Sequence, residues 1–122
     1  MRVICADTEH KVRLYCIDTP EMQQKPWGKT SRDALRGISP GVVSLVKHDK
    51  DRYGRIIAEV LGNDKNLNLE MVKIGQAAVY PQYCKDQSYF DAQNMAQQQK
   101  LGIWSREGLH QAPWEWRSQR RK

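Results

Sequence analysis

A chain of 122 residues is long enough for one hydrophobic core but too short for two, so we expect a single folded unit. Its net charge of +6 and pI of about 9.4 indicate attraction to a polyanion, although many basic proteins are merely well solvated. No apolar run approaches the roughly 20 residues of a membrane span, and the first residues do not resemble a signal peptide. We therefore expect a soluble protein, either cytoplasmic or secreted after processing.

The first third of the chain predicts two strands followed by a helix. Strands at 2–6 and 12–17 would form a hairpin through the polar residues 7–11. In the helix that follows, one apolar face is formed by Trp27, Ala34, Leu35 and Ile38. A Ser-Pro-Gly sequence at 39–41 ends this helix.

The rest of the chain predicts strands at 42–46 and 56–61 and then two helices. The second helix is short and ends at Gly75, and the third is longer. Both have polar residues that can cap their starts: Asn66 or Asn68 for the second helix, and Asp86 or Ser88 for the third. The apolar stripe of the third helix comprises Tyr89, Ala92, Met95 and Ala96.

This order of strands, helix, strands and two helices is typical of the α+β class. Four or five strands with helices inserted late fit the OB-fold, a partly open, five-stranded Greek-key barrel. We therefore predict an OB-fold-like barrel with three helices. The three cysteines, Cys5, Cys16 and Cys84, are odd in number and lack zinc-ribbon spacing, so neither a disulfide framework nor a zinc ribbon is expected.

Residues 13–21, Arg-Leu-Tyr-Cys-Ile-Asp-Thr-Pro-Glu, are the most informative segment. Alternating apolar residues predict a half-buried strand that Pro20 ends, because proline cannot donate to a strand ladder. The strand exit therefore carries Asp18, Thr19 and Glu21 close to Arg13. A second charged segment, Asp-Arg-Tyr-Gly-Arg at 51–55, predicts a tight turn that fixes Arg55 at the start of the next strand.

These two segments resemble the staphylococcal nuclease-like (thermonuclease) family, whose pattern pairs R-L-x-x-I-D-T-P-E with a later D-x-Y-G-R. The resemblance covers nearly the whole chain, because it continues through residues 66–75, 80–84, 102–105 and 113–117. It implies the same OB-fold. It also implies a nuclease that acts on nucleic acid and uses calcium.

The beginning of the chain departs from the family pattern. Family members carry an acidic D-G-D-T segment upstream of the first motif arginine, and Met1 stands roughly where the residues after that segment would be. The resemblance therefore implies that the first barrel strand and one metal-binding aspartate are missing. A barrel without that strand has an open sheet edge, which a second copy could cover to give a homodimer.

Phosphodiester hydrolysis needs cations for the phosphoryl oxygens and a group that orients the attacking water. Arg13 and Arg55 can supply planar guanidinium forks that match phosphate, and Glu21 is the candidate general base. The resemblance implies that these three residues are catalytic. It also implies that Asp18, and Thr19 through its backbone carbonyl, ligate calcium, a hard cation that takes oxygen ligands.

Other residues are candidates for binding the substrate. Tyr53, Tyr80 and Tyr83 could stack on bases, although tyrosines beside strand ends equally often cover the core. Lys50 and Lys85 could steer phosphate, as any charged loop could. We divide the chain into a nuclease-like domain, 1–112, and a basic tail, 113–122, whose tryptophans dock and whose final basic run is disordered.

The sequence therefore predicts a calcium-dependent endonuclease acting on DNA and RNA with little sequence preference, because no base-reading element is evident. Single-stranded or unpaired regions are the favoured substrates. An alternative is a non-catalytic nucleic-acid-binding OB module that has lost a metal ligand. A structural or partner-binding protein is a third. The presence of Arg13, Glu21 and Arg55 together favours the enzyme, because binding alone does not require a carboxylate facing phosphate.

Overall fold

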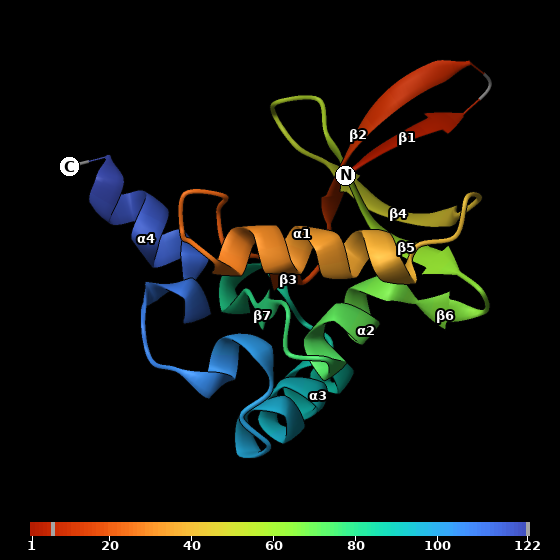
Figure 1. Ribbon diagram of the computed structural model, residues 1–122. Coiled ribbons are helices and arrows are strands. Elements are labelled where there is room, and N and C mark those ends of the chain that lie inside the picture. The colour runs from red at the N-terminus through yellow and green to blue at the C-terminus, as the bar shows by residue number, and fades with distance from the viewer. Residues whose placement is uncertain (6, 122) are drawn as a thin grey trace.

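The computed structural model describes residues 1–5 and 7–121 (Figure 1). Its strands are β1 (Arg2–Cys5), β2 (Thr8–Leu14), β3 (Ile17–Asp18), β4 (Ser44–Lys50), β5 (Ile56–Gly62), β6 (Lys65–Asn66) and β7 (Ala78–Val79). Its α-helices are α1 (Trp27–Ile38), α2 (Leu67–Lys73), α3 (Gln87–Gln98) and α4 (Pro113–Arg120). Three short 3₁₀ helices complete it: η1 (Pro81–Tyr83), η2 (Gly102–Ser105) and η3 (Leu109–Gln111).

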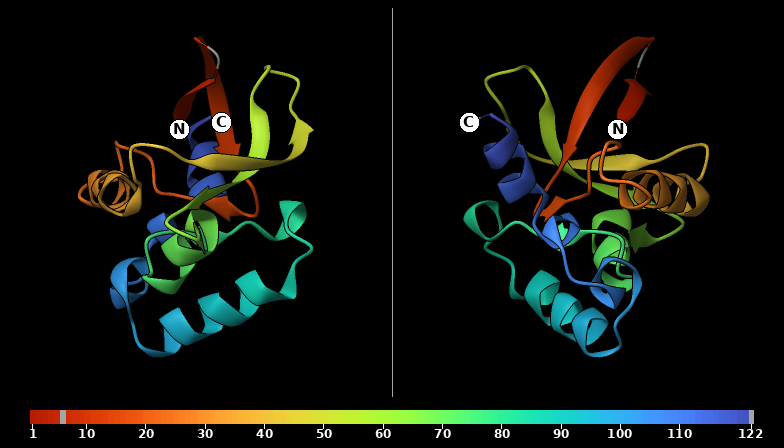
Figure 2. Two further views of the ribbon diagram at one scale, coloured as in Figure 1. Left: turned by 90° about the vertical axis from the view of Figure 1, so that its right-hand side faces the viewer. Right: turned by 60° about the vertical axis from the view of Figure 1, so that its left-hand side comes forward.

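Five strands form one mixed sheet in the order β1-β2-β5-β4, with β6 paired to β5. The β2–β5 pair is parallel and the other pairs are antiparallel. Strands β3 and β7 form a separate two-stranded sheet. Figures 1 and 2 show the β1–β2 hairpin and β4 in the upper part of the molecule, with α2 and α3 beneath them. The predicted α+β class with an OB-like sheet is confirmed.

The second predicted strand, 12–17, is interrupted in the structure. Strand β2 already begins at Thr8 and ends at Leu14, and the chain turns at Tyr15 and Cys16 before β3. Cys16 has a φ of 70°, in the left-handed region, which breaks the strand ladder. Asp18 therefore lies on a different sheet from Arg13. Ala6, predicted at the end of the first strand, lies outside the described residues.

The predicted helix starts are largely correct. Helix α1 spans the predicted residues, and the side chain of Asn66 caps α2 by accepting a hydrogen bond from the Leu69 N–H at 3.2 Å. Asp86 caps α3 through the Ser88 N–H. Met95 was predicted on the apolar stripe of α3 but is 61% exposed.

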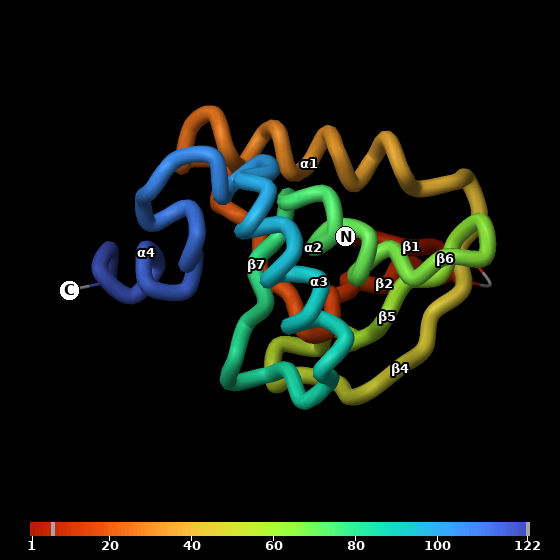
Figure 3. Tube along the Cα trace, turned by 90° about the horizontal axis from the view of Figure 1, so that it is seen from below, coloured from red at the N-terminus to blue at the C-terminus, as the bar shows by residue number. Residues whose placement is uncertain are grey.

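A fourth helix was not predicted. Helix α4 occupies the segment assigned to a basic tail, and the prediction of a disordered final basic run is wrong for residues 118–120. Figures 1 and 3 place α4 at the end of the molecule opposite the β1–β2 hairpin. None of the helices in the described residues is long and apolar enough to cross a membrane.

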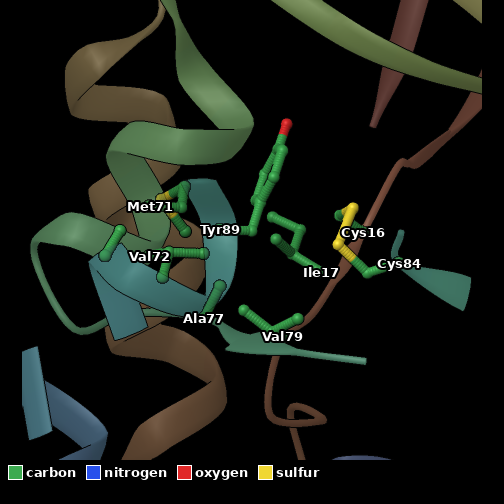
Figure 4. Close-up of a cluster of buried hydrophobic side chains, with 9 residues drawn as sticks. Cys16, Ile17, Met71, Val72, Ala77, Val79, Cys84 and Tyr89 are labelled. Carbon is green, nitrogen blue, oxygen red and sulfur yellow. A yellow bond between two sulfur atoms is a disulfide. The ribbon is translucent and has the colours of Figure 1, made fainter. Parts of the chain in front are cut away.

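The larger core cluster lies between α2, α3 and the β3–β7 pair, around the fully buried Tyr89 (Figure 4). It includes a disulfide between Cys16 and Cys84, which the sequence analysis did not expect. The Tyr80 N–H donates to the Cys16 carbonyl at 2.8 Å beside the β3–β7 pair, and the two cysteine Cα atoms lie 4.3 Å apart. A sequence separation of 68 residues gives no local sign of this pairing. Cys5 is free and exposed.

Candidate active site

Arg13 is held across the turn that leads from β2 to β3. Its Nη1 atom donates hydrogen bonds to the backbone oxygens of Leu14, at 2.9 Å, and Ile17, at 2.7 Å. The side chain therefore braces the turn that the left-handed Cys16 creates. Because Asp18 directly follows Ile17, these bonds also fix the position of Asp18 relative to the Arg13 guanidinium.

Asp18 and Glu21 face one and the same guanidinium, that of Arg117 on α4. Arg117 donates from Nη2 to Asp18 Oδ2 at 2.5 Å and from Nη1 to Asp18 Oδ1 at 3.2 Å. Its Nη1 also donates to Glu21 Oε1 at 2.8 Å. The Asp18 side chain is only 8% exposed, whereas that of Glu21 is 42% exposed. The two carboxylates thus converge on a single position for a cation.

The backbone around Glu21 is tightly packed. Gln24 binds it twice, because its side-chain oxygen accepts from the Glu21 N–H at 2.9 Å and its own N–H donates to the Glu21 carbonyl at 2.8 Å. On α1, Gly28 lies so close that a Cβ atom built there would stand 2.1 Å from the Glu21 oxygen. A side chain at position 28 would therefore displace Glu21.

Arg55 is fixed by the turn at 51–55, as the sequence predicted. Asp51 Oδ1 accepts hydrogen bonds from the backbone N–H groups of Tyr53 and Arg55, both at 2.9 Å. Asp51 Oδ2 accepts from Arg55 Nε at 2.7 Å. Asp51 therefore orients the guanidinium rather than contacting the Asp18 and Glu21 pair.

Three guanidinium groups come close together at this site. Burial lowers the pKa of Arg13, and the positive charges of Arg55 and Arg117 lower it further against the opposing charge of Asp18. The pKa of Arg117 shifts in the opposite direction. Although burial acts to lower its pKa, hydrogen bonds and charge from Asp18 and Glu21 raise it overall. The carboxylates are thus what holds Arg117 beside two other cations.

Two adjoining clefts, of about 630 and 790 Å³, share Arg13, Leu14, Arg55 and Arg117 in their walls. The first cleft is also lined by Asp18, Thr19 and Glu21. The second is also lined by Tyr15, His48, Asp51, Tyr53, Tyr80 and Tyr83. The predicted catalytic and metal-ligating residues are therefore brought together, and the three predicted tyrosines form a neighbouring aromatic wall.

The tyrosines differ in how free their rings are. Tyr80 stacks on Trp114 of α4 with ring centroids 4.7 Å apart, and it meets Tyr83 edge-on. Tyr53 and Tyr83 are 70% and 63% exposed. The guanidinium of Arg55 lies 5.9 Å from the Tyr53 ring centroid, which joins the aromatic wall to the arginines. Lys50 and Lys85 are exposed and are not among the residues lining either cleft.

Sequence reasoning missed Arg117. The residue lies 99 positions from Asp18, in a segment that was assigned to a separate tail. The only available signal was that residues 113–117 belong to the resembling pattern. The docking of α4 through buried Pro113 and stacked Trp114 brings Arg117 into the site.

Most of the residues that form this site fall within a match to a known family. A family model described as staphylococcal nuclease homologue matches residues 11–106, which is most of the chain. The chain belongs to this family. Within it, the matched region contains Arg13, Asp18, Glu21 and Arg55, whereas Arg117 lies beyond it.

The chain is similar to proteins from bacteria and plants. The "Uncharacterized endonuclease" of Escherichia coli is 40% identical over 109 residues, which cover 88% of this chain and 70% of that protein. That of Haemophilus influenzae is 41% identical over 110 residues, covering 89% and 61%. "Staphylococcal-like nuclease CAN1" of Arabidopsis thaliana is 33% identical over 112 residues, covering 91% and 34%.

The donor atoms at this staphylococcal nuclease-like site are oxygens, the type of ligand that calcium prefers. Asp18 offers carboxylate oxygens and Thr19 a backbone carbonyl, and both residues line one cleft. The described residues contain no group of three or more His, Cys, Asp or Glu side chains placed to hold a metal. Calcium takes six to eight ligands, so water and substrate oxygens would have to supply the rest.

Proposed function

We propose that this protein is a calcium-dependent endonuclease that hydrolyses phosphodiester bonds of DNA and RNA with little sequence preference. Family membership supports nuclease activity, since the relatives named above are called nucleases or endonucleases. The observation that carries the proposal is the placement of Arg13 and Arg55 beside Asp18 and Glu21 in one cleft. This arrangement puts cations for a phosphate next to a carboxylate that can orient water.

Each side chain has a distinct role in this proposal. Arg13 and Arg55 bind the phosphoryl oxygens and stabilise the charge that builds on them, and Glu21 orients and deprotonates the attacking water. Among the described residues, Arg13 bonds to protein through Nη1 and Arg55 through Nε, so each keeps further donors for phosphate. Asp18 and the Thr19 carbonyl would hold calcium, which supplies positive charge to the phosphoryl oxygens when bound.

The second cleft is proposed to hold the bases. The exposed rings of Tyr53 and Tyr83 can each stack on an unpaired base, a contact typically contributing about 1–3 kcal/mol. Stacking of this kind is insensitive to base identity and requires bases that are not paired. This supports single-stranded or unpaired regions as preferred substrates, with exposed Lys50 and Lys85 steering the phosphate backbone by charge.

The direct test is hydrolysis of single-stranded DNA and RNA by the whole chain in millimolar calcium and in excess chelator. We expect cleavage with calcium and none with chelator. Arg13→Lys and Arg55→Lys should each reduce the rate, because a lysine ammonium cannot match phosphate with two parallel hydrogen bonds. Undiminished cleavage in chelator would refute the calcium requirement. Binding without cleavage in calcium would favour the non-catalytic OB module instead.

We also propose a homodimer formed through the sheet edge. In the described residues β1 and β4 are the two outer strands of the main sheet, and Ile4 and Val46 on them are 76% and 44% exposed. Unpaired strand edges with exposed apolar residues favour pairing with another chain. Light scattering at several protein concentrations should show a dimer, and a monomer at all concentrations would exclude it.

The disulfide bears on the compartment. Disulfides persist in oxidising environments such as the periplasm or the extracellular space and are rare in the cytosol. The Cys16–Cys84 bond therefore supports an oxidising compartment over the cytoplasm. Thiol labelling of the protein isolated from its native host should then find Cys5 alone reactive.

A further inference from the structure

We infer that Arg117 acts as a built-in cation for Asp18 and Glu21. A divalent cation must displace Arg117, together with α4, in order to bind. This inference rests on the proposed role of Asp18 as a ligand of calcium. It makes Arg117 a residue that determines metal affinity. The C-terminal helix then becomes a movable wall of the active site.

The first step concerns Asp18, which needs a cation. Its side chain is 8% exposed, and both of its oxygens accept hydrogen bonds from Arg117. A buried carboxylate without a positive partner is strongly destabilising, so some cation has to be present in the folded protein. Because the Arg117 guanidinium bonds to both Asp18 oxygens and also to Glu21 Oε1, a metal could not take the Asp18 oxygens while Arg117 remains in place.

The second step concerns the other charges around Arg117. Arg13 and Arg55 line the same two clefts, and the positive charges of Arg55 and Arg117 both act on Arg13. Arg117 is therefore held by two carboxylates against the repulsion of the Arg13 guanidinium. A divalent cation bound to Asp18 would remove part of the attraction and add repulsion, so that Arg117 would leave.

The third step is that Arg117 can move. Its side chain is 31% exposed, and α4 is a single eight-residue helix that follows η3 at the end of the described chain. Besides Arg117, α4 contacts the site through Trp114, whose ring stacks on Tyr80. Release of Arg117 would therefore loosen α4 while leaving the sheet and the core cluster around Tyr89 intact.

The test compares Arg117→Gln with Arg120→Gln in calcium titrations of the whole chain by calorimetry. Both variants lose one charge from α4, but the Arg120 guanidinium stacks on Trp116, 4.9 Å from its ring centroid. We expect Arg117→Gln to bind calcium about tenfold or more tightly than the wild type, since displacement is no longer required. Arg120→Gln should stay within about twofold of the wild type, because screened surface charge acts weakly.

A second readout uses the wild-type chain alone and so does not depend on the variants folding. Backbone hydrogen exchange in residues 113–121 should speed up when calcium is added in place of chelator, while exchange in α2 and α3 stays the same. Equal calcium affinity in both variants, or exchange in α4 that calcium does not change, would overturn the inference. So would a failure of every form to bind calcium.

Failure of every form to bind calcium would also refute the calcium requirement of the proposed function, but the other results are distinguishable from a failure of that function. Neither measurement uses nuclease activity. The inference stands, even where no DNA is cleaved, if three results are found: the wild type binds calcium, Arg117→Gln binds it more tightly, and α4 loosens when calcium is added. If no DNA is cleaved, the endonuclease proposal fails by itself.

Discussion

Two clusters in this molecule are centred on carboxylates, one on Glu59 and the other on Asp18 and Glu21, and the carboxylates differ in the partners that hold them. Glu59 on β5 accepts hydrogen bonds from Tyr89 and Asn66, both at 2.6 Å, and lies 2.8 Å from His48 Nε2. Asp18 and Glu21 instead share one arginine from the terminal helix. Asp18 and Glu21 themselves line a cleft beside further arginines, whereas in the described residues the Glu59 cluster reaches a cleft through His48 and not through Glu59, Asn66 or Tyr89.

The contrast shows how a structural carboxylate differs from one that is available for chemistry. The partners of Glu59 include a fully buried tyrosine and the residue that caps α2, so its contacts are fixed by the core. The partner of Asp18 and Glu21 is a single, partly exposed side chain. Loss of Glu59 contacts should therefore affect stability, whereas changes around Glu21 should affect catalysis.

Among substitutions that leave the carboxylates themselves in place, the largest effect that sharpens this contrast is expected from Gly28→Ala. The added Cβ would stand 2.1 Å from the Glu21 carbonyl oxygen, so the loop carrying the proposed base has to move. A misplacement of about 1 Å can cost on the order of 10²-fold in rate, and we expect a loss of that size in turnover of single-stranded DNA.

Gly37→Ala on the same helix is the matched control. Nothing lies within 4 Å of a Cβ at position 37, and alanine favours helix over glycine by up to about 1 kcal/mol. This variant should keep full activity and be slightly more stable. Equal turnover in the two variants would show that the position of Glu21 does not matter.

The next effect concerns the Cys16–Cys84 disulfide, which, like the Glu59 cluster, should contribute to stability and not to catalysis. Replacing both Cys16 and Cys84 by serine removes a crosslink between positions 68 residues apart and should lower the free energy of unfolding by about 2–4 kcal/mol. Urea denaturation of the two proteins would measure this. A change below about 0.5 kcal/mol would mean that the β3–β7 region is held by packing alone.

A smaller effect is expected from Tyr89→Phe. The ring stays in the core, but Glu59 loses one of its donors, and a hydrogen bond to a charged group contributes about 1.5–3 kcal/mol. We expect the melting temperature to fall while turnover remains at the wild-type level. A turnover loss as large as that of Gly28→Ala would erase the distinction between the two clusters.

The smallest effect is the pH dependence of the stability that Tyr89→Phe loses. Burial acts to raise the pKa of Glu59, but hydrogen bonds from Tyr89, His48 and Asn66 hold it below its ordinary value of 4.5. A lowered pKa contributes stability above the ordinary value, and this contribution disappears as pH falls through the folded-state pKa. The difference in unfolding free energy between wild type and Tyr89→Phe should therefore shrink below about pH 4.5. A difference independent of pH would point to packing as its source.

How much the sequence could predict depended on distance along the chain. Arg13, Asp18 and Glu21 lie within one short motif, and the turn at Asp51 and Arg55 is equally local, so residue type and spacing indicated their positions. The apolar spacing of α1 and the cap at Asn66 were likewise local.

The remaining features depend on contacts between distant segments. The Cys16–Cys84 disulfide requires the β3–β7 pairing, and the contact between Arg117 and Asp18 requires α4 to dock on Tyr80. The left-handed φ of Cys16, which divides the predicted strand, has no sequence signal because such backbone values are uncommon outside glycine. No periodicity in the chain could have indicated these three features.

The most direct test of the account compares Glu21→Gln with Glu59→Gln. Each variant replaces one carboxylate by an amide of nearly the same shape. We predict that Glu21→Gln lowers turnover of single-stranded DNA by about 10²–10⁴-fold with little change in DNA binding or melting temperature. Glu59→Gln should keep its turnover and lose stability. Near wild-type turnover in Glu21→Gln, with calcium present and DNA bound, would contradict the assignment of this cleft as the active site.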